Sequence, residues 1–267
     1  MLKNEFLTAL KSKRVIWVFF FLLALVIYDL YINYMQGFGE YLRGAAASKP
    51  TGEKLFHPCF ASFLSSSTLG HFPQIMMKWA FPLYPLCMYS DSFALQKQYG
   101  YYNVLLTKAD RKSVVFSRFA VAFLIPFFIM LVVLFLNFGL ANIVFQGGTS
   151  FAGRENDLAD ATSLEIFWLN HPYAVYIPYI FIFAILAGFY SMFCSGLAFL
   201  VPKYIVLYPL AFFVWFMLLN MPYTILSLTH CFAYSIKEMV VPAIYYVFLV
   251  GGITVAAFVY KVRYDEL

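Results

Sequence analysis

The chain has 267 residues, of which 63% are hydrophobic, 21% are aromatic and only 12% are charged, and its formal net charge is +5. A soluble domain carries about 25% charged residues, because its surface needs polar cover. The composition therefore excludes soluble enzyme folds and indicates a polytopic membrane protein. No nucleic-acid partner is expected, because the basic residues form no stripe.

Residues 1–14 are predicted to form a helix that lies in the inner membrane interface. Phe6 and Leu10 fall on an apolar face, whereas Lys3 and Lys11 are polar positions. In many membrane proteins such a helix is only an anchor, and that alternative stays open. The basic residues before an apolar run also resemble a secretory signal. No small-residue cleavage site ends the run, so we expect the first span to be retained.

Spanning helices need about 20 mostly apolar residues, because lipid offers the backbone no hydrogen-bond partners. Six stretches meet this description or nearly so: about 15–34, 72–93, 114–137, 174–200, 205–221 and 240–260. Every span except the first contains a proline, which kinks helices but is also ordinary in membrane spans. In the fourth span, Ala187, Ser191 and Ser195 repeat every four residues, which favours close helix packing within the fold or across a dimer.

The placement of Lys and Arg orients these spans, because positive residues are retained in the cytoplasm. With the N-terminus inside, the cytoplasmic segments hold 12 of the 18 basic residues and the external segments hold 6. We therefore expect a bacterial plasma-membrane protein with both termini in the cytoplasm. Loops 35–71 and 138–173 should form small external caps of irregular or short helical structure.

Residues 222–239 are too apolar for a solvated loop and too short for another span. Asn220 and Pro222 stand at their start, which favours a re-entrant hairpin whose irregular backbone is covered by protein. The alternative is that the fifth span continues to about Leu228. The predicted fold is thus a single all-α membrane domain over 1–267, with six spans, an interfacial helix and a re-entrant hairpin before the last span.

Ionisable residues inside a membrane are costly and are functional candidates by default. Asp29 lies toward the outer end of the first span and Asp91 near the inner end of the second, and either can simply reach the interface. Glu238 lies at the start of the last span, where it could pair or gate. Asn220 is a further pathway candidate, with a span-end role as the alternative.

Cysteine and histidine give weaker signals. Four cysteines are too few for a disulfide framework. Cys59 and Cys231 both fall on the predicted outer side, so a bridge between them stays an alternative to free thiols. No histidine or cysteine spacing matches a known zinc pattern, and we expect no metal site.

The segment 94–113 is the largest predicted cytoplasmic connection. Its Leu105 and Leu106 are apolar, and basic residues such as Lys108 and Arg111 flank them. A short helix with an apolar face at the membrane surface would be a natural docking site for a soluble partner.

This segment resembles the corresponding one in permease subunits of type-2 ABC exporters, the ABC-2 type transporter family. The likeness lies in Gly100, the pair Leu105–Leu106, the turn Ala109–Arg111, and Arg118 at the opening of the next span. The predicted architecture is similar over nearly the whole chain. Two features depart from the family pattern: no acidic residue stands in Gln96–Tyr99, just before the glycine, and Arg118 occupies a position where Lys is common.

The resemblance implies a separate ATP-binding subunit, which would bind ATP and Mg²⁺, and a second permease chain, identical or paralogous. No G-x-x-x-x-G-K-[ST] phosphate loop occurs here, so we expect neither an ATPase site nor a cofactor in this chain. Alternating access would rock the two halves about a shared pathway. The residues that would form the docking site are Phe6, Leu10, Gly100, Asn103, Leu105, Leu106, Lys108, Asp110 and Arg111.

Other functions remain as alternatives. A self-contained transporter or channel would need no ATPase. A membrane-bound lipid- or peptide-processing enzyme would need catalytic residues, but neither H-E-x-x-H nor G-x-S-x-G occurs. Catalysis within this chain is therefore not expected. The aromatic composition favours an amphipathic or hydrophobic cargo, such as an antimicrobial peptide or a drug.

Overall fold

The computed structural model describes residues 2–35, 55–65, 72–100, 110–151, 163–201, 203–229, 231 and 235–263. Within these ranges the chain is helical and contains no β-strand, and a bridge between Phe56 and Ser150 is its only strand-like pairing. The all-α class predicted from the sequence is confirmed for this part of the chain.

The described part of the chain consists mainly of helical elements. In order they are α1 (Leu2–Leu10), α2 (Lys13–Asn33), α4 (Pro58–Ala61), α5 (Phe72–Trp79), α6 (Leu83–Pro85), the π-helix η2 (Leu86–Ser90), α7 (Ser92–Gln98), α9 (Arg111–Val144), α10 (Ser163–Asn170), α11 (Pro172–Leu200), α12 (Tyr204–Leu219), the 3₁₀ helix η4 (Ile225–Thr229), α13 (Ile236–Tyr246), the π-helix η5 (Val247–Gly251) and α14 (Gly252–Arg263).

Four helical stretches in the described residues are long and apolar enough to cross a membrane. They are Lys13–Asn33, Arg111–Val144, Pro172–Leu200 and Ile236–Arg263. These lengths and compositions indicate a membrane protein. The four stretches coincide with the first, third, fourth and sixth predicted spans. α12 lies at the position of the fifth and is a shorter apolar helix.

The region predicted as the second span is not one continuous helix. α5 ends at Trp79, and the chain resumes as α6 and η2. Pro82 and Pro85 explain the break, because proline lacks an N–H and clashes with the preceding turn. Side chains bond the carbonyls near the break: the Tyr84 hydroxyl donates to the Met76 carbonyl, and the Trp215 indole N–H donates to the Lys78 carbonyl, both at 2.9 Å.

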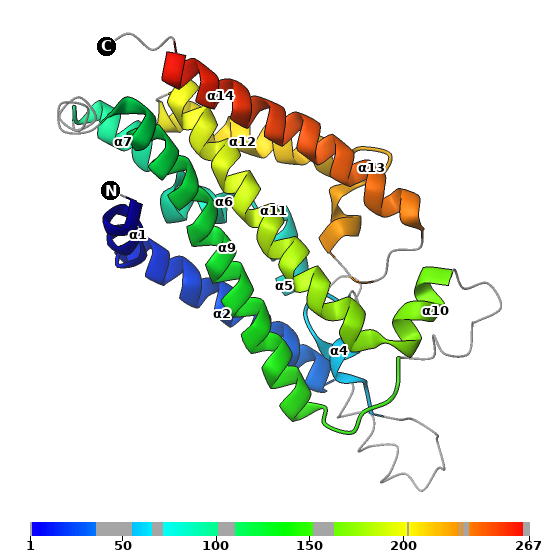
Figure 1. The fold of residues 1–267 in the computed structure, drawn as a ribbon. Coiled ribbons are helices and arrows are strands. Elements are labelled where there is room, and N and C mark those ends of the chain that lie inside the picture. Colours follow the sequence, from blue (N-terminus) through cyan, green and yellow to red (C-terminus); the bar gives the residue numbers. More distant parts are fainter. Residues whose placement is uncertain are drawn as a thin grey trace, which may run out of the picture.

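Helix α11 lies at the centre of the bundle, beside α9 and α14 (Figure 1). A Cβ placed on Gly188 would lie 2.7 Å from the Phe123 ring in α9, and one placed on Gly196 would lie 3.2 Å from the Ala257 Cβ in α14. The close packing predicted for this span is therefore made within the fold. The repeated small residues are all buried: Ala187, Ser191 and Ser195.

The two ends of the bundle differ in which elements they carry (Figure 1). α1, α7 and the last turn of α14 lie at one end, which we call the α1 end. α4 and α10 lie toward the opposite end, which we call the α4 end. The N-terminal helix and the C-terminal helix end therefore share one end of the molecule.

Part of the first predicted external loop lies among the helices. Every residue of Pro58–Ser65 is buried, and we call this segment the plug. The sequence had placed the whole loop as a cap outside the spans, whereas these side chains pack inside the bundle. The apolar character of Phe60, Phe63 and Leu64 explains their burial.

Candidate functional site

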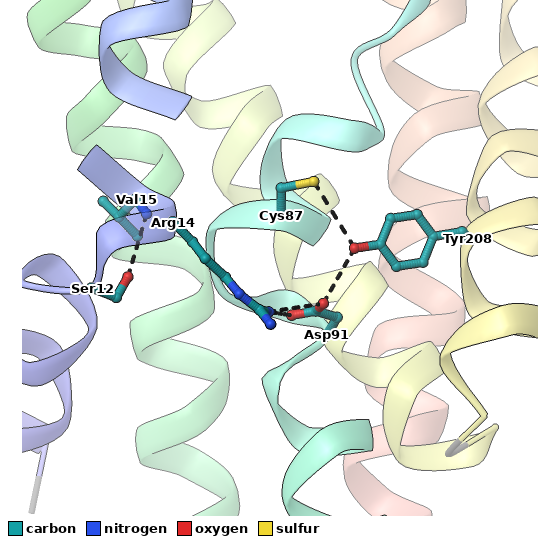
Figure 2. Close-up of polar contacts among 6 residues, drawn as sticks. All are labelled: Ser12, Arg14, Val15, Cys87, Asp91 and Tyr208. Atoms are coloured by element: carbon teal, nitrogen blue, oxygen red, sulfur yellow. Dashed lines mark hydrogen bonds and ion pairs between the residues drawn. The ribbon is translucent and has the colours of Figure 1, made fainter. Parts of the chain in front are cut away.

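Arg14, Asp91 and Tyr208 meet where α2, η2 and α12 come together (Figure 2). Arg14 Nη1 donates to both carboxylate oxygens of Asp91, at 3.3 and 3.4 Å. The Tyr208 hydroxyl donates to Asp91 Oδ2 at 3.2 Å and lies 3.9 Å from Cys87 Sγ. The Arg14 side chain is 58% exposed, whereas that of Asp91 is only 9% exposed. A buried carboxylate is thus paired with a cation that reaches the surface.

We call the cluster of Arg14, Asp91 and Tyr208 the Asp91 centre. Local sequence features position two of its residues. Ser12 caps α2 by accepting a hydrogen bond from the Val15 N–H at 3.3 Å, so Arg14 falls in the first turn (Figure 2). Asp91 stands at the N-cap of α7, but its side chain makes no capping bond. Its carboxylate is instead used for contacts with two other helices.

Two cavities adjoin the Asp91 centre. The first has a volume of about 830 Å³ and is lined by Arg14, Trp17, Val18, Cys87, Asp91, Leu95, Ile205 and Tyr208. The second, of about 470 Å³, shares Arg14 and Asp91 and extends beneath α1 to Glu5 and Arg118. Both volumes fall in the usual range for small-molecule sites.

An ionic network ties α1 to the rest of the α1 end. Glu5 Oε1 accepts a 2.5 Å hydrogen bond from the Tyr89 hydroxyl and lies 3.7 Å from Arg118 Nε. Arg118 also donates to Gln96 Oε1 and lies 5.7 Å from the centre of the Phe93 ring. The Arg118 side chain is only 4% exposed, so its interactions are little weakened by water. Arg118 of α9 therefore joins α1 and α7, and the Tyr89 bond to Glu5 adds η2 to the same network.

At the α4 end, side chains and backbone groups of surrounding segments form hydrogen bonds with the irregular backbone of the plug. Non-helical backbone at membrane depth is tolerated only when protein groups bond it in this way. The bonds are Phe63 N–H to Asn137 Oδ1 at 3.0 Å, Leu64 N–H to Tyr176 Oη at 3.2 Å, Asn33 Nδ2 to the Ala61 carbonyl at 3.0 Å, and Cys231 N–H to the Leu64 carbonyl at 3.1 Å.

A second buried polar cluster lies next to the plug. Asp29 is fully buried in α2, and its Oδ2 accepts hydrogen bonds from Asn33 Nδ2 at 3.4 Å and Gln74 Nε2 at 3.5 Å. Lys78, one turn after Gln74 in α5, is also buried and interacts electrostatically with Asp29. The Asp29 carboxylate is therefore enclosed by protein groups, and its position relative to the interface stays a prediction.

Comparison with known proteins then places the chain in a family. No protein-family model matches it, and no solved structure matches it. It is 30% identical over 212 residues to the uncharacterized protein YybM of Bacillus subtilis (strain 168), an alignment that covers 79% of this chain and 84% of that protein. The chain belongs to the YybM family. The family name assigns no activity.

In this member of the YybM family, the predicted docking residues fall into four groups. Phe6 and Leu10 pack against the chain's own core, and the Phe6 ring lies 6.4 Å from that of Phe128 in α9. Gly100 follows α7 with φ +71°, a left-handed conformation that favours glycine. Asp110 is exposed just before α9, where Arg111 begins the helix. The remaining predicted residues lie outside the described part of the chain: Asn103, Leu105, Leu106 and Lys108.

The other pathway candidates of this YybM-family chain occupy helix ends. Asn220 follows α12, and its Nδ2 donates to the Phe216 carbonyl at 2.8 Å, which agrees with the span-end alternative. Glu238 is in the first turn of α13, and its carbonyl accepts a 2.5 Å hydrogen bond from Ser227 Oγ. In the region predicted as a hairpin, the structure describes η4 and the start of α13, and the hairpin itself stays a prediction.

Sequence reasoning about this YybM-family chain missed several buried polar residues. Gln74 and Lys78 both fall in the predicted apolar span 72–93, and their i, i+4 spacing puts them on one helix face. Cys59 and Cys231 are both buried and are free thiols. Among the described residues, no group of three or more His, Cys, Asp or Glu side chains could hold a metal ion.

Proposed function

We propose that this chain is the membrane-spanning permease subunit of an ATP-driven exporter, working as a dimer with a separate ATP-binding subunit. The observation that carries the proposal is the network around Arg118, which joins α1, η2, α7 and α9 beside the segment 94–113. A protein docked on that segment would push on helices that are already tied together. A small displacement at the surface would then move whole spans.

Six crossings are part of the proposal. Tyr208, near the start of α12, contacts Asp91, whereas Trp215, two turns later, contacts Lys78. α12 thus runs from the Asp91 centre toward the α4 end. The segment made of α5, α6 and η2 runs between the level of Lys78 and the level of Asp91, because Lys78 is in α5 and Asp91 follows η2. With both chain ends at the α1 end, these two segments and the four long helices make six crossings.

Orientation and cargo follow from the same features. The α1 end would face the bacterial cytoplasm, because it carries the basic residues of α1 and of the start of α9. The plug would close the outer end of the pathway between two permease chains. The cavity at the Asp91 centre, with apolar walls and one charged end, supports an amphipathic or hydrophobic cargo, such as an antimicrobial peptide or a drug.

Reconstitution tests this proposal. The chain would be placed in proteoliposomes with and without a candidate ATP-binding subunit, and export of a fluorescent amphipathic peptide would be measured with ATP. We expect export only with both proteins. Export by the purified chain alone would instead favour a self-contained transporter. Conversion of a lipid or peptide by the chain alone would favour an enzyme.

A substitution in the docking segment sharpens the test. Leu105→Asp should abolish ATP-dependent export, because a charge would replace an apolar docking residue. Val259→Thr is the matched control, since Val259 is in α14 and outside that segment. Equal export by Leu105→Asp and the control would contradict the docking role.

A further inference from the structure

The 830 Å³ cavity lies at the level where the first apolar helix begins. Arg14 is the second residue of α2, whose 21 residues suffice to cross the hydrocarbon core. Trp17 follows within one turn and is 75% exposed, as tryptophan commonly is at a membrane interface. Ile205 on the α12 side is 72% exposed. The cavity is therefore open to the surrounding lipid at headgroup depth.

The charged end of this cavity retains hydrogen-bonding capacity. Both bonds from Arg14 to Asp91 leave from Nη1, and the described residues provide no other hydrogen-bond partner for this guanidinium. A guanidinium has five N–H donors and suits the planar recognition of phosphate. The donors on Nε and Nη2 can therefore bind an anion while Asp91 stays paired.

Among the described residues that line this cavity, Arg14 is the cation and Asp91 is the anion. Arg14 and Asp91 cancel each other, and Tyr208 is engaged with Asp91. Lys13, next to Arg14, and Lys203, two residues before Ile205, are both exposed. These two lysines are close in sequence to lining residues, and the walls formed by Trp17, Val18 and Ile205 are apolar.

We propose that this cavity binds one phospholipid with an anionic headgroup from the leaflet at the α1 end. Its phosphate binds Arg14, and one acyl chain lies along Trp17, Val18 and Ile205. A bound lipid of this kind fills the gap between α2 and α12 and keeps the Asp91 centre dry. The cavity is the same one that supports the cargo argument, but the lipid inference rests on the cavity and its charges alone, so failure of ATP-dependent export would not overturn it.

Native mass spectrometry of the full-length chain tests the proposal. Protein in detergent is supplied with phosphatidylglycerol, phosphatidylcholine or soluble glycerol phosphate, and retained ligand is counted together with the shift in melting temperature. We expect one retained phosphatidylglycerol per chain and a raised melting temperature. Equal retention of phosphatidylcholine would overturn the role of charge. An equal shift with glycerol phosphate alone would overturn the lipid assignment in favour of a free-anion site.

Two variants and a control complete the test. Arg14→Gln removes the cation and should weaken phosphatidylglycerol binding about tenfold or more, as loss of a charged hydrogen bond does. Val18→Phe narrows the cavity without changing any charge and should weaken binding similarly, which keeps the test decisive if Arg14→Gln fails to fold. Lys3→Gln removes an exposed charge of α1 outside the cavity and should change binding less than about twofold. Wild-type retention in Val18→Phe would overturn the proposal.

Discussion

Asn137 accepts a 3.0 Å hydrogen bond from the backbone N–H of Phe63 and donates a 2.9 Å bond to the carbonyl of Val26. One fully buried side chain of α9 thus connects the plug to α2. This contact explains how a segment without regular helix can lie among apolar helices, because its donor does not stay unpaired in a medium without water.

Replacing Asn137 should destabilise the fold. Asn137→Leu keeps a similar volume but leaves the Phe63 N–H without its acceptor, which costs roughly 1–3 kcal/mol. We expect a lower melting temperature in detergent, followed by intrinsic fluorescence. Asn220→Leu is the control, because Asn220 is exposed at the end of α12 and its Nδ2 bonds the Phe216 carbonyl of its own helix. A melting temperature of Asn137→Leu equal to that of the control would contradict the account.

The positions of the long helices could be predicted from hydropathy alone. The first expected span, 15–34, coincides with α2, and the third and fourth lie within α9 and α11. Uniformly apolar stretches of this length have few alternatives to a helix, because lipid leaves the backbone no other partners. Pro82 and Pro85 indicate a break in the second span, but they do not predict the residues at which its helices end.

The plug and the Asp91 centre could not be predicted in the same way. Phe63 and Asn137 are 74 residues apart, and Arg14 and Asp91 are 77 apart, so no local pattern reports either contact. An apolar segment in a long loop predicts only that the segment is buried somewhere. The hydrogen-bond partners of the plug and of Asp91 depend on tertiary packing, because packing determines which polar groups are buried together.

Gly188 should be intolerant of a side chain. Gly188→Ala would place a Cβ 2.7 Å from the ring of Phe123 and 3.0 Å from its carbonyl oxygen. That ring is held by Phe127 and Phe189, at 5.5 and 5.2 Å, so it cannot simply turn away. The substitution should cost about 1–3 kcal/mol and lower the melting temperature.

Gly139→Ala provides the matched control for this prediction. Gly139 is also inside a long helix, α9, but nothing lies within 4 Å of its added Cβ. Alanine there should be neutral or stabilise the helix by up to about 1 kcal/mol. If both variants melted alike, the close approach of α11 to α9 would not be a determinant of stability.

Breaking the pair of Glu5 and Arg118 should release α1. Glu5→Gln leaves the largely buried Arg118 cation without its carboxylate, and breaking a buried pair costs up to about 3–5 kcal/mol. Limited trypsin digestion should then cleave faster at Lys11 and Lys13, next to α1. Thr8→Ala is the control, because its hydroxyl bonds only the Asn4 carbonyl of α1. Unchanged cleavage in Glu5→Gln would contradict the tethering role.

Protonation of His57 should lower the stability of the fold at mildly acidic pH. Its Nδ1 accepts a 3.1 Å hydrogen bond from the Cys59 N–H at the start of α4, and burial lowers the pKa of the imidazole below its usual 6.5. The folded state therefore favours the neutral ring. The resulting stability is fully present above pH 6.5 and is lost as the pH falls through the lowered pKa, because a protonated Nδ1 cannot accept.

Melting curves measured between pH 7.5 and 5, at values spaced by about 0.5, would check this. His57→Asn keeps a capping acceptor without a titrating group, so its melting temperature should vary less with pH. His171→Asn, at an exposed position before α11, should keep the wild-type pH profile. Identical profiles for all three proteins would exclude His57 as the origin of the pH dependence.

Purification from the native membrane tests the central claim most directly. The tagged chain would be extracted in mild detergent, its partners identified by mass spectrometry, and ATP hydrolysis of the purified sample measured. The account predicts a co-purified ATP-binding protein, with hydrolysis that Leu105→Asp removes and Val259→Thr preserves. Transport-competent protein that carries no ATP-binding partner, and is unaffected by Leu105→Asp, would contradict it.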